Sequence, residues 1–338
     1  MTHLNRRHTL GLLGGAAALP MISAPALANT QIKVGALRFT SHAASFVAFE
    51  RGYFAEDGLD VSFEFFQAAQ PMAVAIASGD ADYAVTAVSG GLISLAEKGT
   101  AKVIGGALSE EAGIDGQKIL ASNAAFEAGL TRPAALDGKS FAVTQAGSSF
   151  HYMGSKIAGA EGAKVSFKPL QKVGAIIGAM KSGQVDAWSI VPHIAKPMAA
   201  SGAMHIIGDV ADYLPNYQVT TVFTSAANAG NERAKTESFL RAFSKGAADF
   251  NAALVDKTAG EEAAEEMVKL IHKYVYTDRP YEKAAPSIRN GAMRINADAA
   301  LNMASVEDQL NWFKSEKLVK DSITTETLVD GSYAEIVS

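Results

Sequence analysis

The chain of 338 residues contains no cysteine. This absence excludes a disulfide framework, a catalytic thiolate and a metal site built from thiolates. It also removes the residue to which bacterial lipid anchors are attached. We therefore expect an exported form of this chain to carry no lipid anchor.

An excess of basic residues and long apolar runs are lacking too. The chain has 30 Lys and Arg against 35 Asp and Glu, which gives a formal net charge of −5. Proteins that bind nucleic acid neutralise its phosphates with Lys and Arg, so nucleic acid is not an expected partner. No apolar run approaches the roughly 20 residues that cross a bilayer.

Residues 1–28 resemble an export signal rather than part of a fold. Arg6 and Arg7 precede a mildly apolar run at 10–22 that is rich in Gly and Ala, and this is typical of a twin-arginine signal. Thr9 departs from that pattern, because a large apolar residue is usual there. Export by the general secretory route therefore remains an alternative.

Ala-Leu-Ala at 26–28 has the small-x-small pattern of a signal peptidase site. We expect cleavage after Ala28, which removes two positive charges and changes the formal charge from −5 to −7. The expected product is a soluble periplasmic chain of mildly acidic surface, and we expect it to be a monomer.

Strands and helices are expected to alternate from residue 31 onward. Apolar runs at 31–37 and 83–88 predict strands, and strict alternation at 59–65 predicts a strand with one buried face. Between the expected strands at 59–65 and 83–88, Gln70-Pro71 is typical of a helix start and Gly79 of a helix end. This alternation predicts α/β layers around parallel sheets.

Part of this unit occurs twice. Residues 75–83 and 179–187 both contain Ser-Gly-x-x-Asp, with a helix expected before the glycine and a strand after the aspartate. Glycine can adopt the left-handed conformation that ends a helix, and aspartate can bond to nearby backbone N–H groups. Two copies in the same context predict two similar lobes.

The change from one lobe to the other is expected near residue 121, after a short strand at 118–121. A β-rich run at 217–225 is the expected return, and the pattern from Asn231 onward is helical, with helices expected to pack back on the first lobe. The expected division is a discontinuous first lobe at 29–121 and 222–338, and a second lobe at 122–221.

Several segments resemble one family of solute-binding proteins. These segments are 46–61, which contains Glu-Arg-Gly-Tyr-Phe and Gly-Leu-Asp-Val, and 78–82, 136–143 and 180–188. The chain resembles the periplasmic binding proteins of importers for sulfonates, taurine, nitrate and thiamine precursors, the NMT1/THI5-like family. The resemblance implies a type II periplasmic-binding-protein fold of two α/β lobes. Each lobe would be a mostly parallel sheet flanked by helices, with two crossover strands and closure on a ligand.

Ligands of α/β lobes bind beyond the carboxyl ends of the strands, and this rule selects the loops that follow them. The candidate ligand-binding residues are Arg38, Phe39, Thr40, His42, Gln67, Gln70, Thr86, Ser89, Gly147, Ser148, Ser149, Trp188 and His193.

Arg38 and the loop 147–149 are the candidates to hold a ligand from opposite lobes. Arg38 could bind a carboxylate or sulfonate with two hydrogen bonds, or it could be a solvated loop residue. Hydroxyls and free amides at the helix start near Ser148 could bind an anion, or Ser148 could simply cap the helix. Trp188 could wall the cleft or pack in the core.

No catalytic site is expected. Ser148 and Ser149 lie beside His151, but no Gly-x-Ser-x-Gly turn is present and this spacing does not form a triad. The histidines lack the spacing of metal ligands, and no Gly-rich phosphate loop occurs. We therefore expect no catalytic residue, no metal and no cofactor.

The expected function is capture of a small solute in the interlobe cleft and its delivery to the permease of an ABC importer. The solute is expected to be anionic, and either aromatic, heterocyclic or of sulfonate type. One alternative is a ligand-sensing partner of a membrane receptor. Another is an enzyme like the thiamine-pyrimidine synthase of the same fold, but that enzyme depends on a cysteine-rich motif that this chain lacks.

Overall fold

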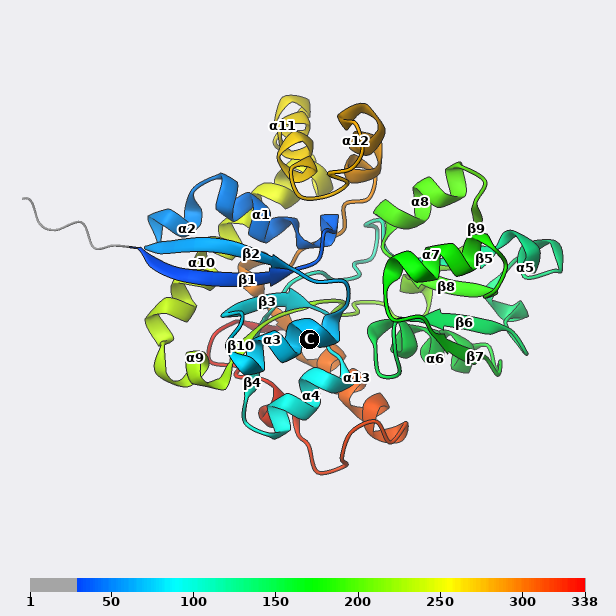
Figure 1. Ribbon diagram of the computed structural model, residues 1–338, viewed down its shortest axis with the longest axis horizontal. Coiled ribbons are helices and arrows are strands. Elements are labelled where there is room, and N and C mark those ends of the chain that lie inside the picture. Colours follow the sequence, from blue (N-terminus) through cyan, green and yellow to red (C-terminus); the bar gives the residue numbers. More distant parts are fainter. Residues whose placement is uncertain (1–28, 338) are drawn as a thin grey trace, which may run out of the picture.

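The computed structural model describes residues 29–337. The expected export signal and its cleavage site lie outside these residues. The described chain forms two lobes, each built on a five-stranded sheet flanked by helices (Figure 1). No helix within 29–337 is both long and apolar enough to cross a membrane.

The first sheet has the strand order β2-β1-β3-β10-β4. β1 runs parallel to β2 and β3, whereas β10 is antiparallel to β3 and β4. Only β10 therefore opposes the other four strands. The strands are β1 (Thr30–Ala36), β2 (Leu59–Phe65), β3 (Tyr83–Thr86), β4 (Ala101–Gly106) and β10 (Thr221–Ser225).

The second sheet repeats this plan in the order β7-β6-β8-β5-β9. β6 is parallel to β7 and β8, and β5 is antiparallel to β8 and β9. The expected fold class is confirmed: both sheets are mostly parallel, and each has one antiparallel crossover strand. The strands are β5 (Lys118–Ser122), β6 (Ser140–Val143), β7 (Ser166–Pro169), β8 (Ala187–Ile190) and β9 (Met204–Asp209).

The sequence repeat has the same structural role in both lobes. The helices α3 (Ala69–Ser78) and α7 (Val173–Lys181) are each followed by a glycine whose φ is positive, at 83° and 69°. The carboxylates of Asp82 and Asp186 then accept a backbone N–H from the neighbouring strand, at 2.8 and 2.7 Å. Asp82 thus bonds to β1, and Asp186 bonds to β6.

The change of sheet comes earlier than expected. An end of the first lobe at residue 121 would cut β5, but β5 hydrogen-bonds along its length with β8 and β9. Because a strand belongs to the sheet with which it pairs, the chain leaves the first lobe within 107–117. It crosses back before Thr221, where β10 begins.

Helices of the first lobe enclose a core rich in aromatic rings. Phe54 stacks on Phe239 at 5.4 Å between ring centroids, and Phe239 stacks on Tyr83 at 4.2 Å. The helices of this lobe are α1 (Ala43–Glu50), α2 (Tyr53–Glu56), α4 (Gly90–Glu97), α9 (Ala226–Asn231) and α10 (Arg233–Phe250), in addition to α3.

The last helices contact both lobes. α10 packs on α1 and α2 as expected, but α12 packs on α8 and α13 on α6, which flank the second sheet. The C-terminal segment thus bridges the lobes instead of covering the first one alone (Figure 1). The remaining helices are α5 (Asn123–Glu127), α6 (Ser149–Ala160), α8 (Pro192–Ala200), α11 (Glu261–His272), α12 (Tyr281–Arg289), α13 (Met303–Ser315) and α14 (Thr325–Leu328).

Candidate ligand-binding cavity

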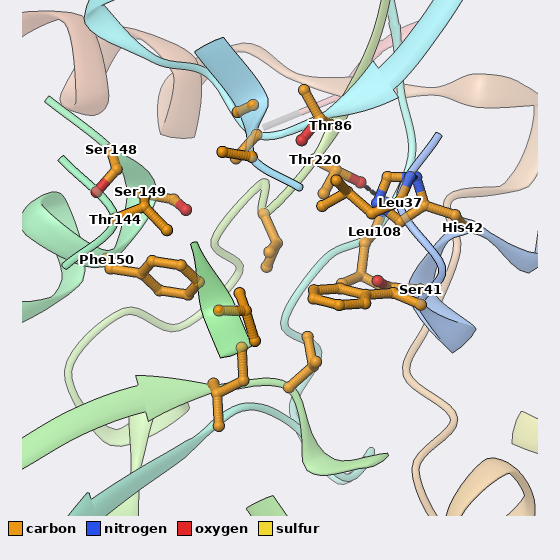
Figure 2. Close-up of a pocket in the computed structure, with 18 of the residues that line it drawn as sticks. Leu37, Ser41, His42, Thr86, Leu108, Thr144, Ser148, Ser149, Phe150 and Thr220 are labelled. Carbon is orange, nitrogen blue, oxygen red and sulfur yellow. Dashed lines mark hydrogen bonds between the residues drawn. The ribbon is translucent and has the colours of Figure 1, made fainter. Parts of the chain in front are cut away.

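A cavity of about 60 Å³ lies between the lobes. Figure 2 shows Thr144, Ser149 and Phe150 on one side of it, facing Ser41 and His42 on the other. None of its lining residues, all within the described chain, carries a formal charge. The polar lining residues are Ser41, His42, Gln67, Thr86, Gln117, Thr144, Ser148, Ser149 and Thr220.

Three helical segments begin at this cavity. They are the 3-10 helix Thr40–His42 that leads into α1, helix α3 after Gln67, and helix α6 after Ser148. The first N–H groups of a helix have no partner within it, and the helix dipole makes this end partly positive. Both lobes therefore present hydrogen-bond donors that suit an oxygen-rich or anionic group.

The loop before α6 has the geometry expected of a helix start. The Ser148 hydroxyl accepts the His151 backbone N–H at 3.4 Å, so Ser148 is the N-cap of the helix. Gly147 has a φ of 72°, and its carbonyl accepts the Gly90 N–H at 3.0 Å from the first lobe. Ser149 and Phe150, in the first turn of the helix, both line the cavity.

His42 adds a hydrogen-bond donor rather than a charge. It is 1% exposed, and burial lowers its pKa to about 3, so its ring is neutral at ordinary pH. Its Nδ1 accepts the Leu37 backbone N–H at 3.3 Å. A neutral imidazole carries one proton, which must therefore sit on Nε2. His42 can donate this N–H to a solute.

Two polar lining residues come from the crossings between the lobes. The Thr220 hydroxyl accepts the Leu108 N–H at 2.9 Å, and Gln117 donates from its amide to Glu110 at 3.2 Å. The sequence did not predict Thr220 or Gln117 as site residues. The expectation that ligands bind beyond the carboxyl ends of strands selects loops within a lobe, and these two residues lie in the crossings. The two predicted crossings were the signal that could have found them.

Residues 39–253 match a protein-family model described as NMT1/THI5 like, which covers more than half of the chain. The chain belongs to the NMT1/THI5-like family. No sequence among the curated proteins matches the chain.

Solved structures with 14–15% sequence identity share the fold of this NMT1/THI5-like chain. The alkanesulfonate-binding protein SsuA from Xanthomonas axonopodis pv. citri, bound to MOPS, is 15% identical, with a TM-score of 0.69 over 91% of this chain and 100% of that one. The periplasmic nitrate-binding protein NrtA from Synechocystis PCC 6803 is 14% identical, with a TM-score of 0.69 over 88% and 84%. A Candida albicans gene product described as having the generic periplasmic binding protein fold is 15% identical, with a TM-score of 0.65 over 91% and 98%.

The structure does not bring Arg38 to the cavity. Its guanidinium lies over the Phe65 ring, 3.7 Å from the centroid, and donates to the Tyr274 carbonyl at 3.1 Å. Residues 37–39 form a turn after β1, in which the Phe39 N–H donates to the Leu37 carbonyl at 2.8 Å, and Leu37 and Phe39 line the cavity. The expected opposition of Arg38 and the loop 147–149 across a ligand is therefore absent.

Trp188 and His193 lie behind the cavity wall. Trp188 is fully buried in β8, and its ring meets the lining residue Phe150 edge-on at 5.7 Å. His193 is 1% exposed and packs against the lining residue Phe39 at 5.3 Å. The aromatic wall is thus made by Phe39 and Phe150, with the other two rings supporting it.

Four further candidates do not line the cavity. One is Gly147, whose carbonyl bonds to the Gly90 N–H of the first lobe. Thr40 is buried, and its hydroxyl has no partner among the described residues. Gln70 hydrogen-bonds with Gln145 of the second lobe. Ser89 caps α4 by accepting the Leu92 N–H at 3.2 Å. The candidates that the structure does bring to the cavity are Phe39, His42, Gln67, Thr86, Ser148 and Ser149.

Proposed function

We propose that this chain is the periplasmic solute-binding component of an ABC importer, and that it holds a compact anionic solute between its lobes. Membership of the NMT1/THI5-like family supports this proposal, as does a fold shared with sulfonate- and nitrate-binding proteins. The observation that carries it is the uncharged cavity, which both lobes and both crossings line.

The cavity volume favours a small solute over a ring. A water molecule needs about 10–15 Å³ of such volume, so the cavity of about 60 Å³ holds the equivalent of about four to six waters. A buried cavity that binds benzene measures about 150 Å³. Of the expected solutes, those of sulfonate or nitrate size therefore fit this closed arrangement, and aromatic acids do not.

We propose no catalytic role for the serines beside His151. The His151 Nδ1 accepts the Gly147 N–H at 3.1 Å, and the His151 ring packs edge-on against Phe167 and Trp312. The Ser148 hydroxyl already accepts the N–H of residue 151. Ser148 and His151 are thus engaged in separate helix-start contacts, and this supports a role of the loop in solute binding.

Calorimetric titration and thermal melting with ethanesulfonate, nitrate, benzoate and urea test the proposal. Ethanesulfonate or nitrate should bind, and at 100 times its Kd it should stabilise the fold by about 2.7 kcal/mol. Benzoate is too large and urea lacks the negative charge, so neither should match the compact anions. Preferred binding of benzoate or urea, or no binding of either anion, would contradict the proposed solute class.

A further inference from the structure

Glu110 is a buried carboxyl at the junction of the two crossings. It is 2% exposed and lies in the first crossing, between β4 and β5. Its backbone N–H donates to the Tyr217 carbonyl of the second crossing at 2.9 Å. Its position is therefore at the hinge of the molecule, outside the set of residues that line the cavity.

The Glu110 side chain is fixed by Gln117. Its Oε1 accepts the backbone N–H of Gln117 at 3.0 Å and the side-chain Nε2 at 3.2 Å. Its Oε2 has no partner within the described chain, and it packs so closely on Gly116 that a Cβ at that glycine would overlap it. This close fit leaves the carboxyl a single orientation.

The contact with Glu110 also orients the Gln117 amide. Because the NH₂ group faces the carboxyl, the amide oxygen is the part of this side chain left for the cavity that Gln117 lines. Hydroxyls can donate or accept, whereas the His42 Nε2–H and the helix-start amides only donate. The oriented Gln117 oxygen only accepts.

Taking the proposed function as its basis, we propose that Gln117 determines specificity and that Glu110 is its positioning residue. A solute that carries an N–H or O–H group beside its oxyanion can donate to Gln117 Oε1 while the helix starts bind the oxyanion. A solute without such a group leaves this buried acceptor unpaired. The site therefore prefers hydroxylated or aminated small anions over their unsubstituted analogues.

The surroundings of Glu110 shift its pKa, so its titration can be measured separately from solute affinity. Burial raises the pKa of Glu110 to about 7, while the bonds from Gln117 and the charge of Lys118 lower it and Asp209 raises it. The Lys118 ammonium is bonded to Asp115 and Asp209. Arg294, which lines a second cavity together with Glu110, is paired with Glu111 and Asp256. The Tyr217 hydroxyl is buried without a partner in the described chain.

The sign of this titration follows from the raised pKa. The folded chain holds the Glu110 proton up to about pH 7, whereas the unfolded chain releases it near 4.5. Stability from this group is therefore present below pH 4.5 and is lost as the pH rises to 7. Glu110→Gln removes that loss, so the variant gains melting temperature relative to the parent between pH 4.5 and 7.

The test compares the affinity of ethanesulfonate with that of 2-hydroxyethanesulfonate, which differ by one hydroxyl. The parent should bind the hydroxylated compound about tenfold more tightly, since one hydrogen bond to a buried acceptor is worth about 1.4 kcal/mol. Gln117→Met and Glu110→Ala should bring the two affinities within about twofold of each other. Glu110→Gln keeps the acceptor for the Gln117 amide and should restore the preference, and the control Glu111→Gln should not change it.

The outcomes separate this inference from the proposed function. If ethanesulfonate and its hydroxylated analogue bind equally to the parent, or if the preference survives in Gln117→Met, the specificity role is overturned and the proposed function stands. If neither sulfonate binds but nitrate does, only the specificity role is overturned; if nitrate also fails to bind, both are overturned. If Glu110→Ala melts below the assay temperature, the decision comes from Gln117→Met and Glu110→Gln, together with the pH dependence of melting.

Discussion

Tyr276 joins the C-terminal segment to the second lobe. It lies in the turn between α11 and α12 with a φ of 59°, a left-handed conformation that is costly for a bulky side chain. Its hydroxyl donates to the His193 carbonyl at 2.7 Å, and it lies 3.0 Å from His193 Nδ1. Because the hydroxyl proton is used on the carbonyl, the imidazole Nδ1–H must be the donor in the second bond.

Replacement of Tyr276 by phenylalanine removes both bonds and leaves the ring in place. His193 is 1% exposed, so its Nδ1–H and carbonyl would be left unpaired in a dry environment. Such groups cost about 1–3 kcal/mol. The bonds link α8 of the second lobe to the C-terminal segment, so we expect the cost to fall on the closed form. At a tenfold change per 1.4 kcal/mol, the Kd of ethanesulfonate should rise about 5- to 140-fold.

Calorimetric titration of Tyr276→Phe with ethanesulfonate measures this effect. Tyr281→Phe is a matched control, because the Tyr281 hydroxyl donates to Glu265 at 2.5 Å and this bond joins α12 to α11 without reaching the second lobe. The control should change the melting temperature without a comparable change in Kd. Equal losses of affinity in the two variants would refute the argument that the Tyr276 bonds hold the lobes together.

Three other outcomes follow from the structure. Ser149→Ala should weaken ethanesulfonate binding by about 0.5–1.5 kcal/mol, while Arg38→Ala should bind like the parent; the reverse order would mean that the cavity is not the binding site. Gly291→Ala should lower the urea midpoint by the equivalent of about 1–3 kcal/mol, because its Cβ would overlap the His193 backbone, and an unchanged midpoint would contradict this packing. Burial lowers the pKa of His42 and His193 to about 3, so the stability that each contributes is present above pH 6.5 and is lost as the pH falls toward 3. His42→Gln should reduce this acid loss in urea titrations, and an unchanged acid profile would contradict the buried neutral state.

The two-lobe plan could be predicted because its signals are local. The glycines after α3 and α7 adopt the left-handed conformation that ends a helix, and the aspartates that follow bond to the backbone of the adjacent strand. When such a local sequence pattern occurs twice, it predicts a repeated structural unit without knowledge of the distant contacts. The helix start at 147–149 was predictable for the same reason, since glycine, hydroxyl and N-cap act within one turn.

The cavity residues depended on details that the sequence does not carry. β1 was expected to reach residue 37 but ends at Ala36, and in the turn that follows, Leu37 and Phe39 line the cavity while Arg38 does not. Gln117 lines the cavity because the first crossing passes between the two lobes there, and Glu110 orients its side chain. Neither relation has a spacing rule, because each arises from packing between segments of different lobes.

The lobes are also held together by bonds that involve no solute. On α6, whose first turn faces the cavity, Tyr152 donates to Asp308 of α13 at 2.5 Å and Lys156 pairs with the same carboxylate at 3.0 Å. The Gly90 N–H donates to the Gly147 carbonyl, and Tyr276 bonds to α8.

A solute shifts an open–closed equilibrium only by its different affinities for the two forms. These contacts already favour the closed form. The solute therefore needs to supply only the rest of the free energy of closure, which neutral hydrogen-bonding groups can provide. An uncharged cavity is therefore consistent with tight binding, provided that the interlobe bonds persist without the solute. Weakening them should lower affinity even though every group that touches the solute is retained.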